Sequence, residues 1–238
     1  DLTSITSTKI HLPENVNKVI ITAGITSIQE CEKNKFESHQ ANVIGTSNLI
    51  SQLEDLKINY LFLSSSTVFS MNARNLYEDA LREPSCTYGL QKKEVEDYIL
   101  CLKYGSILRM TKLIDSQFTL IRSWQKKLLN DQTIEAYEDL RVAPITPQLL
   151  AKWIDSWLID SEKGTYHLSC SRDISYYQLS LELAAYLNKS PSLIKATKCT
   201  SQNNVPIYHP VEAYLHAKNP KSLISPIINE ILDICKAI

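Results

Sequence analysis

Lys18-Val19-Ile20-Ile21-Thr22-Ala23-Gly24 is a short, continuous apolar run that ends in small residues. Runs of this kind are typical of a strand that is buried on both faces of a parallel sheet. The small residues at its end leave room for a ligand close to the backbone. Two later stretches, Tyr60–Leu63 and Ser106–Arg109, are interpreted as strands of the same sheet.

Helical patterns separate these strands along the chain. Apolar residues recur on one face between residues 36 and 56, and good helix formers after Thr87 predict a helix to about Leu102. The alternation predicts an α/β fold, with a Rossmann-like parallel sheet and right-handed crossovers. Ligands collect at the carboxyl ends of such strands. One cleft is therefore expected at three pairs of residues: Ala23-Gly24, Ser64-Ser65 and Met110-Thr111.

Beyond Thr111 the pattern is mixed and has no glycine-rich loop. We interpret residues 1–135 as a Rossmann-like dinucleotide-binding domain and residues 136–238 as a smaller C-terminal substrate-binding lobe, with some exchange of chain between the two. Helices are expected at 118–130, 146–158, 175–187 and 224–234, with a short strand at Thr165–Leu168.

The composition excludes several functional classes. The 238 residues carry a net charge of −1, which is no electrostatic footprint for nucleic acid or for an anionic membrane. No apolar run approaches the roughly 18 to 20 residues that span a bilayer. The six cysteines are dispersed without metal-ligand spacing, which favours reduced thiols. We therefore expect a cytoplasmic protein that has no metal site and binds neither nucleic acid nor membrane.

The pentapeptide Tyr88-Gly89-Leu90-Gln91-Lys92 carries the clearest chemistry. Residues four apart share a helix face, so Tyr88 and Lys92 are expected to meet. An ammonium about 4 Å from a phenol, at a dielectric of about 20, favours the phenolate by roughly 4 kcal/mol and lowers the pKa of the tyrosine. Such a tyrosine could act as an acid-base catalyst on the oxygen of a bound carbonyl group. Ser65, at the end of a strand, is placed to bind the same carbonyl oxygen. The alternative is an exposed helix face with an ordinary i, i+4 pair.

Several segments, in this order, resemble the extended short-chain dehydrogenase/reductase family, and within it the sugar-nucleotide reductases of the dTDP-4-dehydrorhamnose type. The most specific match outside the Tyr-Lys pair is the Asn-Val-x-Gly-Thr-x-Asn-Leu helix, at residues 42–49. Other matching segments are Asp1-Leu2-Thr3, Ser64–Phe69, Asp139–Pro144, Gly164–Leu168 and Pro210–Leu215.

The resemblance implies hydride transfer from NAD(P)H to a sugar 4-keto carbon. Tyr88 would protonate the oxygen, Lys92 would hold the nicotinamide ribose, and Ser65 would orient the carbonyl. It also implies a nucleotide-sugar substrate and a possible homodimer. Besides Tyr88 and Lys92, the expected cofactor contacts are Ala23, Gly24, Asn42, Ser64 and Met110, and the expected substrate contacts are Ser66, Thr67, Thr111 and Arg141.

Two of these assignments have plain alternatives. Asn42 belongs either to the hydrogen-bond network of the site or to a helix cap, and Arg141 is either a diphosphate ligand or a surface arginine. The chain also departs from the family, because the glycine-rich phosphate loop has no counterpart before Asp1. We therefore expect the sequence to be an incomplete version of the gene product.

The departures leave the function open among three hypotheses. A reductase comes first, and a sugar-nucleotide epimerase with the same Ser/Tyr/Lys trio is the alternative within enzymes. A catalytically inactive, reductase-like regulatory or scaffold subunit is the third, and the missing glycine loop favours it. Ser66-Thr67 replace the Asp-Glu of the related dehydratases, which disfavours dehydration, and His209 stands where the reductases have arginine.

Overall fold

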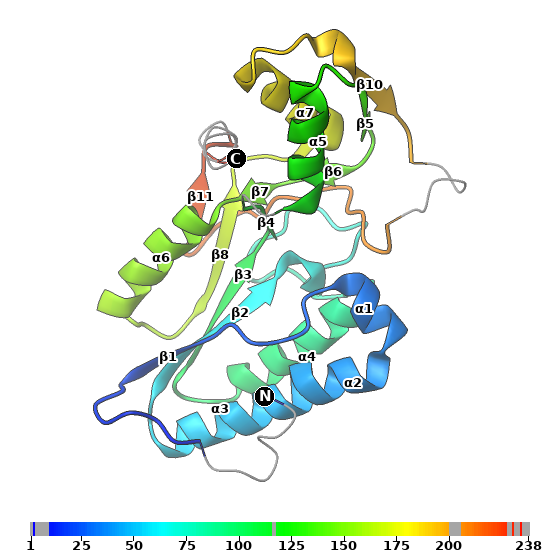
Figure 1. Ribbon diagram of the computed structural model, residues 1–238. Coiled ribbons are helices and arrows are strands. Elements are labelled where there is room, and N and C mark those ends of the chain that lie inside the picture. The colour runs from blue at the N-terminus through cyan, green and yellow to red at the C-terminus, as the bar shows by residue number, and fades with distance from the viewer. Residues whose placement is uncertain are drawn as a thin grey trace.

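The computed structural model describes residue 2, residues 10–115, 118–199 and 206–227, and residues 230 and 234. Its centre is a five-stranded sheet in which every pairing is parallel (Figure 1). The predicted α/β fold with a Rossmann-like parallel sheet is therefore confirmed. The strands, in spatial order, are β1 (Lys18–Ile21), β2 (Asn59–Ser65), β3 (Gly105–Met110), β8 (Thr165–Cys170) and β11 (Leu223–Ser225).

Strand β2 shows why the apolar runs of this chain form a buried sheet. Successive side chains of a strand point to opposite faces. Tyr60 and Phe62 enter one hydrophobic core, whereas Leu61 enters a second core on the other face. All three side chains are at most 1% exposed, so both faces of the sheet need a cover of helices.

Helices on both faces provide this cover (Figure 1). α3 (Thr46–Asp55) and α4 (Thr87–Leu100) pack on the face that carries Tyr60 and Phe62. α6 (Pro147–Ile159) packs on the opposite face through Trp153 and Trp157. The Thr146 hydroxyl caps α6 by accepting a hydrogen bond from the backbone N–H of Leu149 at 3.3 Å.

The helix expected between residues 36 and 56 is present, with an irregularity in its middle. It consists of α2 (Lys35–His39), the π-helix η2 (Gln40–Gly45) and α3, and a short helix α1 (Ile28–Lys33) precedes it. π-Helical turns are frequent at functional sites. The wider turn here contains Asn42, one of the predicted site residues.

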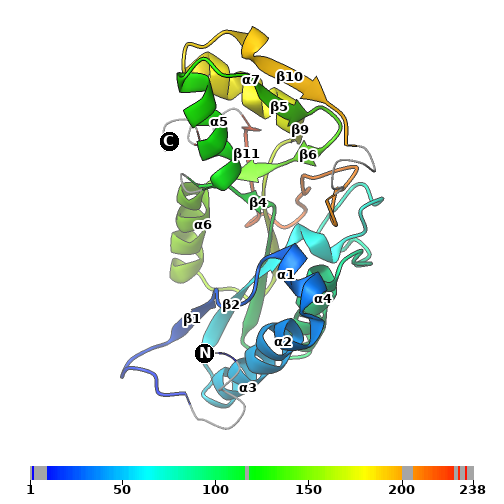
Figure 2. The same cartoon turned by 45° about the vertical axis from the view of Figure 1, so that its right-hand side comes forward.

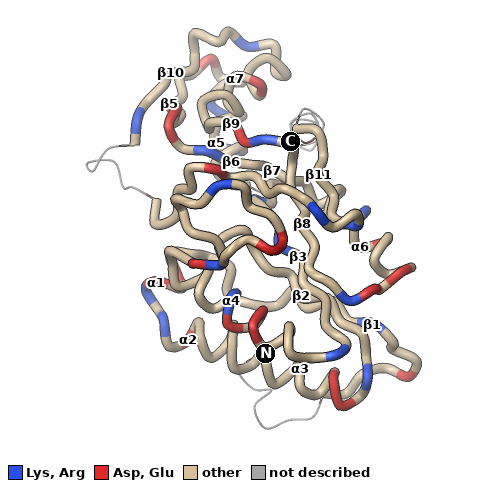
Figure 3. The backbone as a smooth tube through the Cα atoms, turned by 180° about the vertical axis from the view of Figure 1, so that it is seen from behind, with Lys and Arg blue, Asp and Glu red and all other residues tan. Residues whose placement is uncertain are grey.

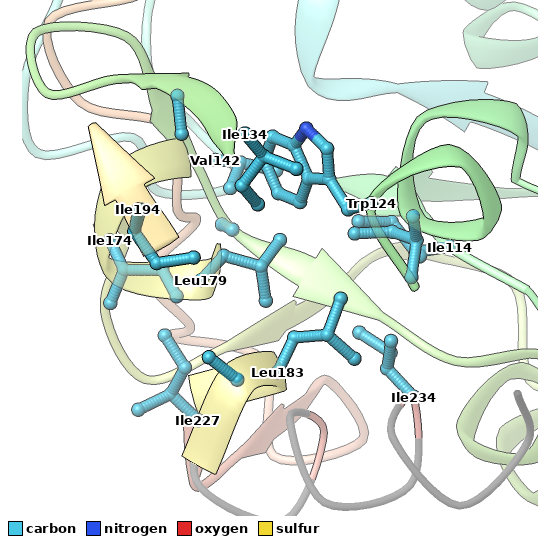
Figure 4. Packing of buried hydrophobic residues seen from close by; sticks show 14 of the residues in the cluster. Ile114, Trp124, Ile134, Val142, Ile174, Leu179, Leu183, Ile194, Ile227 and Ile234 are labelled. Atoms are coloured by element: carbon cyan, nitrogen blue, oxygen red, sulfur yellow. The ribbon is translucent and has the colours of Figure 1, made fainter. Parts of the chain in front are cut away.

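A second lobe lies beyond the carboxyl ends of the central strands (Figures 1 and 2). α5 (Thr119–Leu129) and α7 (Tyr176–Tyr186) enclose a core with the parallel strands β5 (Ile134–Tyr137) and β10 (Ile194–Thr197). Figure 4 shows the packing of this core, including Trp124, Ile134 and Leu183. The shorter elements are β4 (Lys112–Leu113), β6 (Arg141–Val142), β7 (Pro144–Ile145), β9 (Ile174–Ser175) and η4 (Pro191–Leu193).

Three elements of residues 136–238, the predicted substrate-binding lobe, belong instead to the central sheet and to the helices that cover it. α6, β8 and β11 complete the sheet and its cover, so the exchange of chain across residue 135 is extensive. The division into 1–135 and 136–238 stays a prediction. The expected helix at 224–234 is wrong at its start, where Ile224 and Ser225 lie in β11. The remainder of that segment, like Asp1 and Thr3, lies partly outside the described residues.

Charged residues of both signs are interspersed along helices and loops in the rear view of Figure 3. No helix in the described part of the chain is both long and apolar enough to cross a bilayer.

Candidate active site

Tyr88 lies in the first turn of α4, which packs against the turn η3 (Ser66–Val68) directly after β2. A Cβ atom on Gly89 would lie 2.2 Å from the carbonyl oxygen of Thr67. That distance is far below van der Waals contact, so only glycine is compatible with this packing. Gly89 therefore allows the first turn of α4, and Tyr88 with it, to lie against the residues that end β2.

Lys92 meets Tyr88 on the same face of α4. The Lys92 Nζ atom lies 5.6 Å from the centroid of the Tyr88 ring and 4.4 Å from that of Phe62. It donates a hydrogen bond of 2.8 Å to the carbonyl oxygen of Leu63. Both Tyr88 and Lys92 are only 8% exposed, which contradicts the alternative of an exposed helix face.

The expected effect of Lys92 on Tyr88 is wrong for this structure. Burial raises the pKa of Tyr88, and the nearby thiols of Cys31 and Cys86 raise it further. Burial also lowers the pKa of Lys92 to about 8, against the attraction of Glu96. Desolvation disfavours the charged form of both groups and is the largest cause of both shifts. Tyr88 therefore remains a protonated phenol at neutral pH.

Ser65 ends β2 and pairs in register with Met110 at the end of β3. Its hydroxyl accepts a hydrogen bond of 3.2 Å from the backbone N–H of Thr67 and so caps η3. The hydroxyl oxygens of Thr67 and Thr111 are buried and have no hydrogen-bond partner among the residues described. Unpaired hydroxyls are costly in a core and are available to a ligand. The roles predicted for Ser65, Ser66, Thr67, Met110 and Thr111 stay predictions.

Asn42 fixes the loop that follows β1. Its amide oxygen accepts a hydrogen bond of 2.7 Å from the backbone N–H of Ile25, and its amide nitrogen donates to the Ile25 carbonyl and to Gln91. A Cβ on Gly24, whose φ is 149°, would lie 2.9 Å from the same amide oxygen, so this loop requires glycine. Asn42 is thus a member of a network rather than a cap, while its contact with a cofactor, like those of Ala23 and Gly24, stays a prediction.

A buried ion-pair network lies beside the site. Glu96 is completely buried and accepts hydrogen bonds from Arg109 at 2.8 to 3.1 Å, from Arg82 at 3.0 Å and from the Ser64 hydroxyl at 2.5 Å. Arg109 also donates to the carbonyl oxygen of Glu78 at 2.8 Å. The network joins α4 to β2 and β3. Ser64 was predicted as a cofactor contact, but in this structure its hydroxyl donates its hydrogen bond to the Glu96 carboxylate.

Arg141 lies in the second lobe and is paired with Asp173. Its Nε donates a hydrogen bond of 2.8 Å to Asp173 Oδ1, and the backbone N–H of Ala213 donates to Asp173 Oδ2 at the same distance. Arg141 therefore helps to anchor the C-terminal segment. Its role as a diphosphate ligand stays a prediction.

Three residues that the sequence did not indicate surround Tyr88. Cys31 and Cys86 form a buried apolar cluster with it, and Tyr208 packs against this cluster. The Tyr208 hydroxyl donates to the carbonyl oxygen of Ser66, 142 positions earlier in the chain, at 3.2 Å. Its neighbour His209, singled out in the sequence, is exposed and contacts Pro206. No local pattern in the sequence signals these contacts.

The cavity beside α6 is a separate feature. It has a volume of about 360 Å³ and is lined by the aromatic residues Trp153, Trp157 and Tyr166 together with several polar residues. None of the predicted site residues lines it. The candidate active site is defined by the contacts around Tyr88.

The family model described as RmlD substrate binding domain matches residues 1–229. The chain belongs to the RmlD substrate-binding-domain family. This membership agrees with the resemblance found in the sequence to the reductases of sugar nucleotides.

Relatives of this RmlD-type chain are distant in sequence. The spore coat polysaccharide biosynthesis protein SpsK of Bacillus subtilis (strain 168) is 23% identical over 191 residues, which are 79% of this chain and 67% of SpsK. A dTDP-4-dehydrorhamnose reductase from Bacillus anthracis, solved in complex with NADP, has a TM-score of 0.77 at 18% identity. The match covers 92% of the RmlD-type chain and 79% of the reductase.

A second reductase gives a similar result. The dTDP-4-dehydrorhamnose reductase from Yersinia enterocolitica has a TM-score of 0.80 at 16% identity, over 99% of this chain and 84% of the reductase. Sugar-nucleotide dehydratases and an epimerase share the architecture as well. At these identities the likeness establishes the fold of the RmlD-type chain, and its chemistry has to be argued from its own residues.

Proposed function

We propose that the protein is an NAD(P)H-dependent reductase of a 4-keto sugar nucleotide, with Tyr88 as the proton donor. The observation that carries this proposal is the buried pair of Tyr88 and Lys92 on α4, beside the carboxyl ends of β2 and β3. Family membership and the reductases of the same fold support the substrate class. NADP in one of these reductases supports the cofactor.

The residues at this site suit reduction of a carbonyl. When hydride reaches the carbonyl carbon, negative charge develops on its oxygen, and a proton donor next to that oxygen stabilises the transition state. Tyr88 would donate this proton from its hydroxyl. Lys92, whose pKa is about 8, is largely protonated at neutral pH and would stabilise the developing charge. The Ser65 hydroxyl would orient the oxygen.

Reduction and epimerisation make different demands on Tyr88. Burial raises the pKa of Tyr88, so the phenol is protonated at neutral pH and is a weaker acid than a free tyrosine. An epimerase that oxidises and then reduces the same carbon needs the tyrosine first as a base and then as an acid. The shared fold of a UDP-glucose 4-epimerase keeps epimerisation as the second candidate.

Two features of the described residues support the binding of a dinucleotide. A buried ammonium on Lys92 and a glycine of positive φ at Gly24 suit the ribose of a dinucleotide and a close approach to the backbone. The dinucleotide would supply the hydride. None of the glycines in the described ranges forms a cradle for a pyrophosphate, so we assign this chain only the nicotinamide-ribose end.

The test is NADPH oxidation with dTDP-4-dehydrorhamnose as substrate. Tyr88→Phe should lower kcat by roughly 10² to 10⁴ because it removes the proton donor. Tyr98→Phe, on the same helix but packed in the hydrophobic core, is the matched control and should retain activity. Epimerisation without net oxidation of NADPH would favour the second candidate. Absence of both turnover and calorimetric NADPH binding in the wild-type protein would refute the proposal and favour an inactive regulatory or scaffold subunit.

A further inference from the structure

The proposed substrate carries its negative charge away from the carbonyl that is reduced. In a nucleotide sugar the diphosphate is joined to C1, which lies across the pyranose ring from the 4-keto carbon. If the carbonyl lies beside Ser65 and Tyr88, at the carboxyl end of β2, the diphosphate is expected beyond the strand ends, toward the second lobe. Phosphate charges in this position need a cationic partner.

Two arginines of the sheet and the second lobe are already paired. Arg141 donates a hydrogen bond to Asp173 at 2.8 Å. Arg109 is buried, and its guanidinium is bound to the carboxylate of Glu96. A diphosphate would have to displace a carboxylate from either arginine, and at Arg109 it would leave a buried negative charge without its partner. Neither arginine is therefore a ready ligand.

Lys112 lies between the sheet and the second lobe. It begins β4, two residues after Met110, which ends β3 and pairs in register with Ser65. Ile114, two residues further on, is already part of the core of the second lobe. Figures 1 and 2 show β4 at this junction. Two residues of extended chain span at most about 7 Å, so Lys112 is close to the strand ends at which the carbonyl would bind.

The ammonium of Lys112 is free to take a new partner. Among the residues that the structure describes, its Nζ atom has no hydrogen bond and no ion pair, and it lies 5.2 Å from the centroid of the Phe118 ring. The side chain is exposed, yet the protein around it lowers the pKa of Lys112 by desolvation. A side chain that is both accessible to solvent and surrounded by protein lies in a recess of the surface. An anion in this recess would stabilise the charged form of the lysine.

We propose that Lys112 binds the diphosphate of a nucleotide sugar in the recess at β4. The substrate class rests on the proposed function, whereas the contact with a nucleoside diphosphate does not require turnover. The three N–H donors of the ammonium are all available to phosphate oxygens. The ring of Phe118 holds the ammonium through a cation–π contact and does not use up these donors.

Calorimetric titration of the whole chain with dTDP and with UDP tests this contact. Both nucleotides carry the diphosphate, so Lys112→Met should weaken the binding of both by about tenfold, which corresponds to one charge-assisted hydrogen bond. Lys112→Arg keeps the charge and should recover most of the affinity. Lys127→Met removes an exposed lysine from α5 with the same change in net charge, so it is the matched control and should leave both affinities unchanged.

The salt dependence shows whether the charge is the cause. Raising the concentration of NaCl should weaken the binding of dTDP to the wild-type protein more than its binding to Lys112→Met. Unchanged affinities in Lys112→Met overturn the proposal and return the role to Arg141. A loss of affinity that retains the salt dependence of the wild type overturns it as well, and so does a wild-type protein that binds neither nucleotide.

Turnover separates this proposal from the proposed function. With NADPH and dTDP-4-dehydrorhamnose, Lys112→Met should raise the KM for the sugar nucleotide about tenfold and leave kcat nearly unchanged, because the diphosphate is bound equally in the ground state and the transition state. Binding of dTDP and UDP that depends on Lys112, without turnover by the wild-type protein, refutes the reductase and supports the Lys112 site. Turnover with an unchanged KM in Lys112→Met supports the reductase and overturns the Lys112 site.

Discussion

Lys92 gives the sharpest test of the electrostatics at this site. Burial lowers its pKa from 10.5 to about 8, while in the unfolded chain it titrates near its ordinary value. Between these two values the unfolded chain binds more protons than the folded one, so raising the pH through this range stabilises the fold. Below pH 8 the lysine is charged in both the folded and the unfolded chain, so its burial lowers the free energy of unfolding by the full amount of the pKa shift. Two and a half pKa units correspond to roughly 3 kcal/mol.

The substitution Lys92→Met isolates this contribution. At pH 7 the variant avoids the burial of a charge but loses the hydrogen bond to Leu63, so we expect it to be as stable as wild type or more stable. From pH 7 to about pH 10.5 the wild type should gain roughly 3 kcal/mol relative to the variant. The raised pKa values of buried tyrosines such as Tyr60 affect both proteins and cancel in the difference.

Urea unfolding, followed by tryptophan fluorescence at several pH values, measures this difference. The three tryptophans are buried in the two lobes, so their emission reports on the whole fold. Lys93→Met, which removes the neighbouring lysine that is paired with Asp97 at the surface, controls for the loss of a lysine from α4. A stability difference between wild type and Lys92→Met that stays constant across this pH range would refute the reasoning.

Two further predictions concern the frame of the site. Arg109→Met should lower the free energy of unfolding by about 3 kcal/mol, because it leaves the buried Glu96 with too few partners. Asp79→Asn, which breaks the solvent-exposed pair with Lys218, is the control and should leave the free energy of unfolding almost unchanged. Equal effects of the two substitutions in urea titrations would contradict this. Gly89→Ala would place a methyl group 2.2 Å from the Thr67 carbonyl. It should cost at least about 1 to 3 kcal/mol and displace the first turn of α4, and an unperturbed crystal structure of the variant would argue against it.

The elements that the sequence predicted well are those whose signals are local. A continuous apolar run flanked by small or polar residues identified β1, β2 and β3, and the spacing of Tyr88 and Lys92 placed both on one face of α4. Strand β8 was also found, from Thr165–Leu168. Its place in the central sheet depends on pairing with β3 and β11, which no local pattern encodes.

The features that were missed depend on contacts between distant residues. Asn42, in the π-helical turn, forms hydrogen bonds with Ile25 and Gln91, which lie 17 and 49 positions away in the chain. The sequence predicted a lowered pKa for Tyr88, whereas the structure raises it. The prediction was wrong because the spacing gives the distance to Lys92 but not the burial of both groups. Tyr208 lies 142 positions from Ser66, so only the folded chain brings it to the site.

The charges around the site divide into two kinds, and the division points to function. Glu96 and Arg109 are buried but satisfy each other through several hydrogen bonds, as structural charges must. Lys92 is buried with no carboxylate at ion-pair distance in the described part of the chain, and its ammonium has only the Leu63 carbonyl oxygen. A methionine would fill the same space at lower cost. A lysine that destabilises the free protein makes physical sense if negative charge develops beside it during the reaction. Lys92→Met should therefore separate the two properties, with stability kept or gained and turnover lost.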